Sequence, residues 1–128
     1  MIKVYPAIIH EEEGGSWLEF PDLKGCYTDG DSLEELMINA EEALGGYLAA
    51  KIDAGEELPL PSKLENVKCS ADASKTYIST DTNRYHRDTR AVKRMISLPS
   101  WLAKEADNRK LSLSKITKEA LLKKIDIA

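Results

Sequence analysis

The chain has 128 residues, of which 42% are hydrophobic and 31% are charged, as in an ordinary globular protein of one domain or two small ones. No run of 18 apolar residues occurs, so we expect neither a transmembrane helix nor a membrane partner. The opening MIKVYPAIIHEEE lacks a signal-peptide cleavage site, and Cys26 and Cys69 lack metal-ligand spacing. We therefore expect a cytoplasmic protein with reduced thiols.

The charges are divided between the two halves of the chain. Residues 1–83 hold 6 Lys and Arg against 17 Asp and Glu, a net charge of −11, whereas residues 84–128 hold 12 against 5, a net charge of +7. A basic module favours a polyanionic partner, and an acidic module favours a basic protein partner. The alternative is that both sets of charges belong only to solvated surfaces.

Three short strands are expected before the first helix. Residues 2–10 are rich in β-branched and apolar side chains, and Pro6 favours an edge position or a bulge because proline lacks an N–H. Gly14-Gly15 predicts a turn into a hairpin partner in which Leu18 and Phe20 share one face. GCYTDGDS predicts a third strand that ends at Asp29-Gly30.

A long amphipathic helix should follow. Ser32 can cap it, and Glu35 three residues later completes a capping box, while Gly55 ends the helix. Its apolar side chains recur every three or four residues: Leu33, Leu36, Met37, Ala40, Ala43, Leu44, Tyr47, Leu48 and Ile52. Gly45-Gly46 within it predicts either a slightly weakened helix, which we favour, or a close approach of another backbone.

The acidic half should end with one more strand. Residues 75–82 alternate, with Ile78 and Thr80 on one face, and a further weak strand is possible at 67–70. The order β-β-β-α-β predicts an α+β domain over residues 1–83, with a sheet covered on one face by a helix. Residues 84–91 form a short, polar, basic linker.

Residues 92–128 predict one strand and two short helices. Pro99 stops the strand, Ser100 can cap the first helix, and Ser112 can cap the second. A lone strand with two short helices is too small to fold alone, but a second copy would pair the strands and join four helices in one core. Such a ribbon fits the major groove of B-DNA, which is about 12 Å wide.

The predicted ribbon assigns the DNA contacts. Lys93, Met95 and Ser97 share the outward face of the strand and should reach the bases, whereas the start of the second helix should hold phosphate. The segment MISLPSWLAKEADNRKLSLSKITKEAL resembles the ribbon-helix-helix family of DNA-binding dimers. The family often has glycine where Lys110 or Leu111 stands here. We expect these residues to bind DNA: Arg90, Lys93, Arg94, Met95, Ser97, Ser112, Ser114 and Lys115.

The N-terminal half resembles a second family. Its segment FPDLKGCYTDGDSLEEL is similar to the signature of HicB antitoxins. That resemblance implies a partial RNase H-like fold before the DNA-binding tail, neutralisation of a HicA-like, mRNA-cleaving ribonuclease toxin, and repression of the shared operon. It also implies a homodimer on operator DNA, or a larger even-numbered assembly with toxin. We expect the toxin contacts at Glu11, Glu12, Glu13, Trp17 and Asp22.

Three other interpretations compete with the antitoxin. A two-metal nuclease needs carboxylates that converge on ions about 4 Å apart, whereas the acidic residues here lie in expected turns. We therefore expect no catalytic residue, metal or cofactor. A stand-alone repressor with a ligand-sensing or protein-sensing domain is the second alternative, and a tail that only dimerises is the third.

Overall fold

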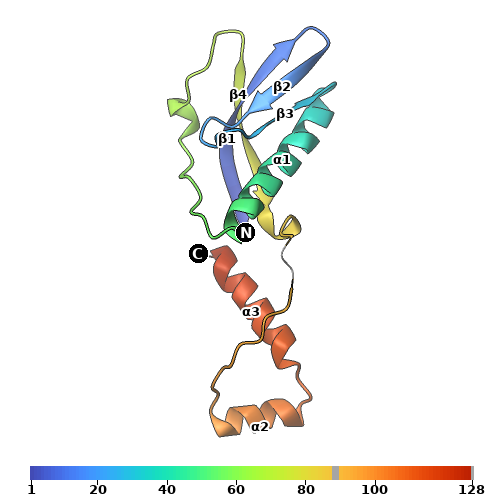
Figure 1. Ribbon diagram of the computed structural model, residues 1–128, viewed down its shortest axis with the longest axis vertical. Coiled ribbons are helices and arrows are strands. Elements are labelled where there is room, and N and C mark those ends of the chain that lie inside the picture. Colours follow the sequence, from blue (N-terminus) through green and yellow to red (C-terminus); the bar gives the residue numbers. More distant parts are fainter. Residues whose placement is uncertain (88–89, 128) are drawn as a thin grey trace. The chain divides into compact units, whose positions relative to one another are not determined.

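In the computed structural model, which describes residues 1–87 and 90–127, the chain divides into two compact units, Met1–Asp88 and Thr89–Ala128. The first unit is a mixed α and β structure and the second is helical (Figure 1). The expected order β-β-β-α-β is confirmed for the first unit. No helix in the described ranges is long and apolar enough to cross a membrane.

An antiparallel sheet forms the base of the first unit. It contains β1 (Ile2–Glu12), β2 (Gly15–Glu19), β3 (Tyr27–Gly30) and β4 (Ser74–Asp81), in the order β3-β2-β1-β4. The β1–β2 hairpin turns at Gly14, whose φ of 90° lies in the region that favours glycine. The register sets His10 opposite Trp17, and Trp17 opposite Asp29, so that three strands contribute neighbouring side chains.

Pro6 lies in a strand that is paired on both sides. Its partner on β4 is Tyr77, but the pairs between β1 and β2 begin only at Ile8. Pro6 therefore occupies an edge position, as predicted, although β1 as a whole is a central strand. Pro6 is tolerated because β2 does not extend past it, so that β1 has an edge there locally.

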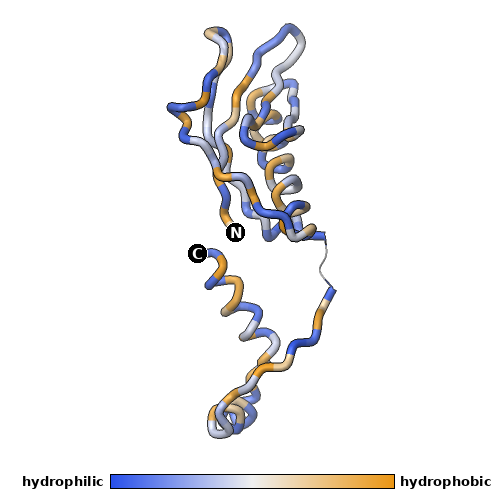
Figure 2. Tube along the Cα trace, turned by 60° about the vertical axis from the view of Figure 1, so that its left-hand side comes forward, coloured by the Kyte–Doolittle hydropathy of each residue, from blue (hydrophilic) through white to orange (hydrophobic). Residues whose placement is uncertain are grey.

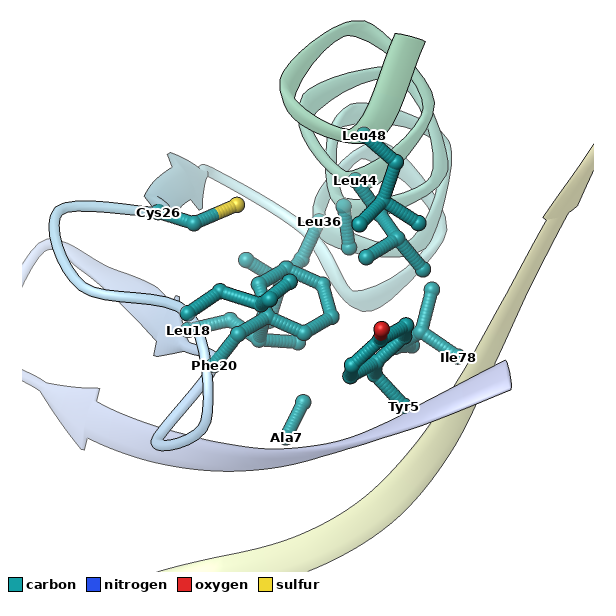
Figure 3. Packing of buried hydrophobic residues seen from close by; sticks show 11 residues of the cluster. Tyr5, Ala7, Leu18, Phe20, Cys26, Leu36, Leu44, Leu48 and Ile78 are labelled. Carbon is teal, nitrogen blue, oxygen red and sulfur yellow. The ribbon is translucent and has the colours of Figure 1, made fainter. Parts of the chain in front are cut away.

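Helix α1 (Leu33–Asp53) covers one face of the sheet. The Ser32 hydroxyl accepts the Glu35 N–H at 3.1 Å, which confirms the cap, but the Glu35 carboxylate accepts from Asp31 N instead of completing the capping box. At the other end, Gly55 (φ 74°) follows the helix as predicted. Figure 3 shows the side chains of α1 pointing at those of the sheet; the buried cluster comprises Tyr5, Ala7, Leu18, Phe20, Leu23, Cys26, Leu36, Ala40, Leu44, Leu48 and Ile78.

The two glycines inside α1, Gly45 and Gly46, differ in the space around them. A Cβ built on Gly46 would meet nothing within 4 Å, so Gly46 fits the simpler interpretation of a weakened helix. A Cβ built on Gly45 would overlap the ring of Tyr85 and lie 2.6 Å from Thr80 Oγ1. The close approach is therefore real at Gly45, although the neighbour is a side chain and not a second backbone.

The segment between α1 and β4 contains no further strand in its described residues. The expected weak strand at 67–70 is wrong: these residues follow the 3₁₀ turn η1 (Leu64–Asn66) without a strand partner, and side chains of β4 bond to the backbone of this loop. Leu64 N–H donates to the Tyr77 hydroxyl at 2.9 Å, and Lys75 Nζ donates to Val67 O at 2.9 Å. Side chains of β4 thus hold this loop without a strand ladder.

After β4, the 3₁₀ turn η2 (Thr82–Arg84) leads into residues that bond to α1. The Tyr85 hydroxyl donates to Glu41, and His86 Nδ1 lies 2.8 Å from Asp53 Oδ1. Burial, and then the hydrogen bond to Glu41, raises the pKa of Tyr85 to about 12. Part of the segment expected as linker is therefore attached to the first unit, up to Arg87, whose N–H donates to Asp53.

The second unit contains α2 (Ser100–Asn108) and α3 (Leu113–Ile127). Residues 90–99, which include the expected strand, have no helix or strand in the single chain, since an isolated strand has no partner for its hydrogen bonds. Ser100 does not cap α2, because Pro99 occupies the cap position and its carbonyl accepts from Leu102 and Ala103. Ser112 does cap α3, since its hydroxyl accepts the Lys115 N–H at 3.3 Å.

The helical unit has a left-handed turn and an amphipathic helix. Lys110, between the helices, has a φ of 53°, the left-handed conformation that glycine adopts without strain. Figure 2 shows hydrophobic and hydrophilic residues alternating along α3, as in an amphipathic helix.

Both cysteines of the first unit are free thiols, as predicted. Cys26 is buried in the cluster between α1 and the sheet, and Cys69 is exposed in the loop before β4.

Candidate functional site

Two adjoining hollows lie at the turn end of the β1–β2 hairpin. The first, which we call the aromatic hollow, is lined by Trp17, Tyr27, Thr28 and Asp29. The second, which we call the acidic hollow, is lined by Glu12, Glu13, Gly14, Gly15, Ser16, Trp17, Asp29, Gly30, Asp31 and Glu35. They share Trp17 and Asp29, so they form one continuous surface, which we call the hairpin surface.

Trp17 is held from two sides. Its indole Nε1–H donates to Glu12 Oε1 at 3.0 Å. Its ring stacks on the His10 ring, with centroids 4.1 Å apart and planes inclined by 15°. His10 Nε2 in turn lies 3.5 Å from Glu19 Oε1. A half-buried tryptophan with these contacts keeps its orientation before any partner arrives.

The hairpin surface is acidic and partly apolar. Its lining residues contribute five carboxylates and no lysine or arginine. Tyr27, on the edge strand β3, is 68% exposed although it is a large aromatic residue. The carboxylates suit a partner with positive charge. The exposed aromatic rings suit a protein partner, because aromatic residues are enriched among the side chains that anchor interfaces.

The structure brings together some of the predicted toxin contacts and separates others. Glu12, Glu13 and Trp17 all line the hairpin surface. Glu11 is exposed on β1 but does not line either hollow. Asp22 uses both carboxylate oxygens on Ser62, accepting the backbone N–H at 2.8 Å and the hydroxyl at 2.6 Å. Asp22 therefore holds the loop after α1.

Sequence reasoning missed several residues of this surface as binding residues: Tyr27, Thr28, Asp29, Asp31 and Glu35. The signal that could have found Asp29 is the register that sets it opposite Trp17. That register depends on where β2 and β3 begin, and the turn residues alone do not fix this. Within the described residues, no group of three or more His, Cys, Asp or Glu could hold a metal ion.

The second unit has few buried side chains of its own. Among its described residues, Ala106 is the one hydrophobic residue that is buried. The large apolar residues are exposed in the single chain: Val92, Met95, Ile96, Leu98, Trp101, Leu102, Leu111, Leu113, Ile116, Leu121, Leu122 and Ile125. So many exposed apolar side chains in so short a unit indicate an interface that the single chain leaves open.

The predicted DNA-binding residues fall into two groups in this unit. Arg90, Lys93, Arg94, Met95 and Ser97 lie in the segment before α2, and Met95 is fully exposed. Ser112, Ser114 and Lys115 lie at the start of α3. The backbone N–H of Lys115 donates to the Ser112 hydroxyl in the helix cap. This backbone N–H is therefore not available to a phosphate.

Comparison with known proteins identifies a family for this chain. The family described as "HicB_like antitoxin of bacterial toxin-antitoxin system" matches residues 5–126. A 14.9 kDa protein from the rep-hol intergenic region of Haemophilus phage HP1 is 31% identical over 106 residues, which is 81% of this chain and 79% of that protein.

Solved structures extend the likeness to the fold. A chain of a toxin-antitoxin complex from Streptococcus pneumoniae superimposes with a TM-score of 0.64 at 22% identity, covering 97% of this chain and 99% of that one. A chain of the HicA3 and HicB3 toxin-antitoxin complex gives a TM-score of 0.53 at 25% identity, covering 62% of this chain and 99% of that one. Because the family match spans nearly the whole sequence, this chain belongs to the HicB-like antitoxins of bacterial toxin-antitoxin systems.

Proposed function

We propose that this antitoxin binds and neutralises a HicA-like, mRNA-cleaving ribonuclease through its first unit and represses its own operon by binding operator DNA through its second. The main support for the proposal is that two chemically different surfaces lie in separate units of one chain. An acidic hairpin surface lies in one unit, and exposed apolar residues lie in a basic unit. Each surface fits one of the two activities, and both activities are binding rather than catalysis.

The hairpin surface supports the toxin-binding half of the proposal. A ribonuclease that holds RNA must present positive charge, and a unit with a net charge of −11 over residues 1–83 competes for that charge. The related HicB3 was solved in a complex with HicA3. Glu12, Glu13 and Trp17 are the expected residues that line the surface, and Glu11 stands beside it.

The open apolar side chains of the second unit support a homodimer. Pairing residues 92–98 of two copies would give the backbone groups on one edge of each strand their partners and bury Ile96 and Leu98 against the helices. The shared core would then contain four helices, two from each chain. The functional division would be residues 1–83 for toxin, 84–91 as a connection whose first part bonds to the first unit, and 92–128 for DNA and dimerisation.

The same pairing would set out the DNA contacts. In an antiparallel ribbon, Lys93, Met95 and Ser97 of each chain project from one face toward the bases, and Met95 is suited to contact a thymine methyl group. Ser114 and Lys115 at the start of α3, together with Arg90, would hold phosphates. Arg94 would share the other face of the strand with Ile96 and Leu98.

Two binding measurements on the full chain test the proposal. The first is co-purification with the product of the neighbouring gene, followed by an RNA-cleavage assay with and without the antitoxin. The second is binding to a duplex from its own promoter and to a scrambled duplex of equal length. We expect inhibition of cleavage and preference for the promoter duplex. A chain that is monomeric and binds both duplexes equally would rule out the repressor half, and uninhibited cleavage would rule out the toxin half.

A further inference from the structure

We propose that the aromatic hollow receives an arginine side chain of the toxin, with the guanidinium stacked on Trp17 and paired with Asp29. This inference rests on the proposed function, because it names the group that the hairpin surface would recognise. The hollow is lined by Trp17, Tyr27, Thr28 and Asp29. It therefore combines two aromatic rings with one carboxylate, and the acidic hollow adjoins it.

The sheet register shows which side of Trp17 is open. His10 on β1 and Asp29 on β3 are its partners on the two neighbouring strands. The side toward β1 is occupied by the stacked His10 ring. The side toward β3 borders the hollow, where the remaining lining residues all belong to β3.

The indole is also fixed in advance. Its N–H is bonded to Glu12, and its stack on His10 restrains rotation about the side-chain bonds. A ring that is already oriented loses little conformational entropy when a partner stacks on it, so more of the contact energy is available for binding. Tyr27, which is largely exposed, gains the most burial when the hollow is filled.

The chemistry of the lining selects the occupant. A carboxylate beside an aromatic face attracts a cation and repels an anion, which excludes a phosphate or an acidic peptide. Arginine fits better than lysine because its planar guanidinium can stack on a ring and donate two parallel hydrogen bonds to a carboxylate. The surrounding carboxylates of Glu13, Asp31 and Glu35 add charge complementarity to a basic protein.

The test measures dissociation of the toxin, the neighbouring gene's product, from full-length antitoxin variants. Trp17→Leu removes the π face and Asp29→Asn removes the charge, and each should lower affinity at least about 10-fold, mainly through faster dissociation. Glu34→Gln is the matched control. It removes the same unit charge from an exposed residue of α1 that does not line either hollow, and it should stay within about twofold of the wild type. Trp17→Phe, which keeps an aromatic ring, should lose less than Trp17→Leu.

The occupant is identified from the toxin side. Each toxin arginine is changed to lysine in turn, and one such change should lose affinity in wild-type antitoxin but little more in Trp17→Leu, because both changes remove the same interaction. If wild-type antitoxin binds toxin but Trp17→Leu and Asp29→Asn match Glu34→Gln, the hollow is not the interface, although the proposed function stands. If the hollow matters but no arginine couples to Trp17, the occupant is not arginine. If wild-type antitoxin binds no toxin, both proposals fall.

Discussion

Gly45 of α1 leaves the space that the ring of Tyr85 fills. A Cβ at Gly45 would overlap that ring, whose hydroxyl donates to Glu41 one turn earlier on the same helix. Glu41 also accepts from Thr80 on β4 at 3.0 Å. The glycine, the tyrosine and the carboxylate thus attach the end of β4 and the residues after it to α1.

The neighbouring glycines of α1 give opposite predictions. Gly46→Ala should stabilise the first unit by about 0.5–1 kcal/mol, because alanine favours the helix and its methyl group meets open space. Gly45→Ala gains the same helix propensity but must displace Tyr85, so it should destabilise by about 1–3 kcal/mol. Urea unfolding of both variants checks the pair. Equal stabilisation by both would show that the Tyr85 ring is not seated against Gly45.

The turn between α2 and α3 should accept glycine. Lys110 has a φ of 53°, so Lys110→Gly should stabilise the second unit by about 1 kcal/mol by removing the left-handed strain of a side chain. Lys104→Gly, at an exposed position inside α2, is the control and should destabilise by about the same amount. Thermal unfolding of the full-length variants should move in opposite directions, and a lower transition for Lys110→Gly would contradict the turn.

The thiols should differ in reactivity and in their effect on stability. Burial raises the pKa of Cys26 to about 11, whereas Cys69 is exposed. At pH 8 a thiol reagent should therefore label Cys69 quickly and Cys26 only on unfolding. Because the folded state favours the neutral thiol, the stability that Cys26 contributes is complete below its unfolded pKa of about 8.5 and is lost as pH rises to about 11. A Cys26→Ala variant should lose this part of the alkaline dependence, and rapid labelling of both thiols in the native chain would contradict the burial.

Dimerisation is tested by a charge in the proposed shared core. Ile96→Asp would place a carboxylate between the two copies, at a cost of several kcal/mol, and should abolish both the dimer and promoter binding. Asn108→Asp at the exposed end of α2 adds the same single negative charge outside the apolar set and serves as a control for assembly. Sedimentation of Ile96→Asp as an unaltered dimer would be incompatible with the ribbon.

The two groups of DNA-binding residues should respond differently to mutation. Lys93→Ala should lose about 1–3 kcal/mol on the promoter duplex and relax its discrimination, because lysine can donate to guanine O6 or N7. Lys115→Ala should weaken all duplexes about equally and lower the salt slope by roughly 1 for each phosphate that is no longer neutralised. A salt series on promoter and scrambled duplexes separates the two. If variants of Lys93, Met95 and Ser97 all keep the wild-type ratio of promoter affinity to scrambled-duplex affinity, the basic residues before Val92 become the better candidates for base contacts.

The sequence was sufficient where local patterns determine structure. The alternation around Leu18 and Ile78, the cap at Ser32 and the glycine at Gly55 correctly predicted the order of the strands and the limits of α1. It was insufficient where distant residues decide. The extent of β2 leaves Pro6 at a local edge of a strand that is otherwise central, and the Lys75 side chain of β4 bonds to Val67 O where a strand was expected. The hairpin surface needs the register of β1, β2 and β3, which brings Asp29 beside Trp17.

The exposed apolar residues of the second unit would make DNA binding depend on the concentration of the chain. Helices of 9 and 15 residues with little buried surface are marginal alone, so the DNA-binding form would be completed only when two chains meet. At dilution the population of that form would rise with the square of the amount of chain present. The first unit, which has its own core, would remain folded at every dilution. One polypeptide would thus inhibit toxin in proportion to its abundance while switching its promoter off above a threshold.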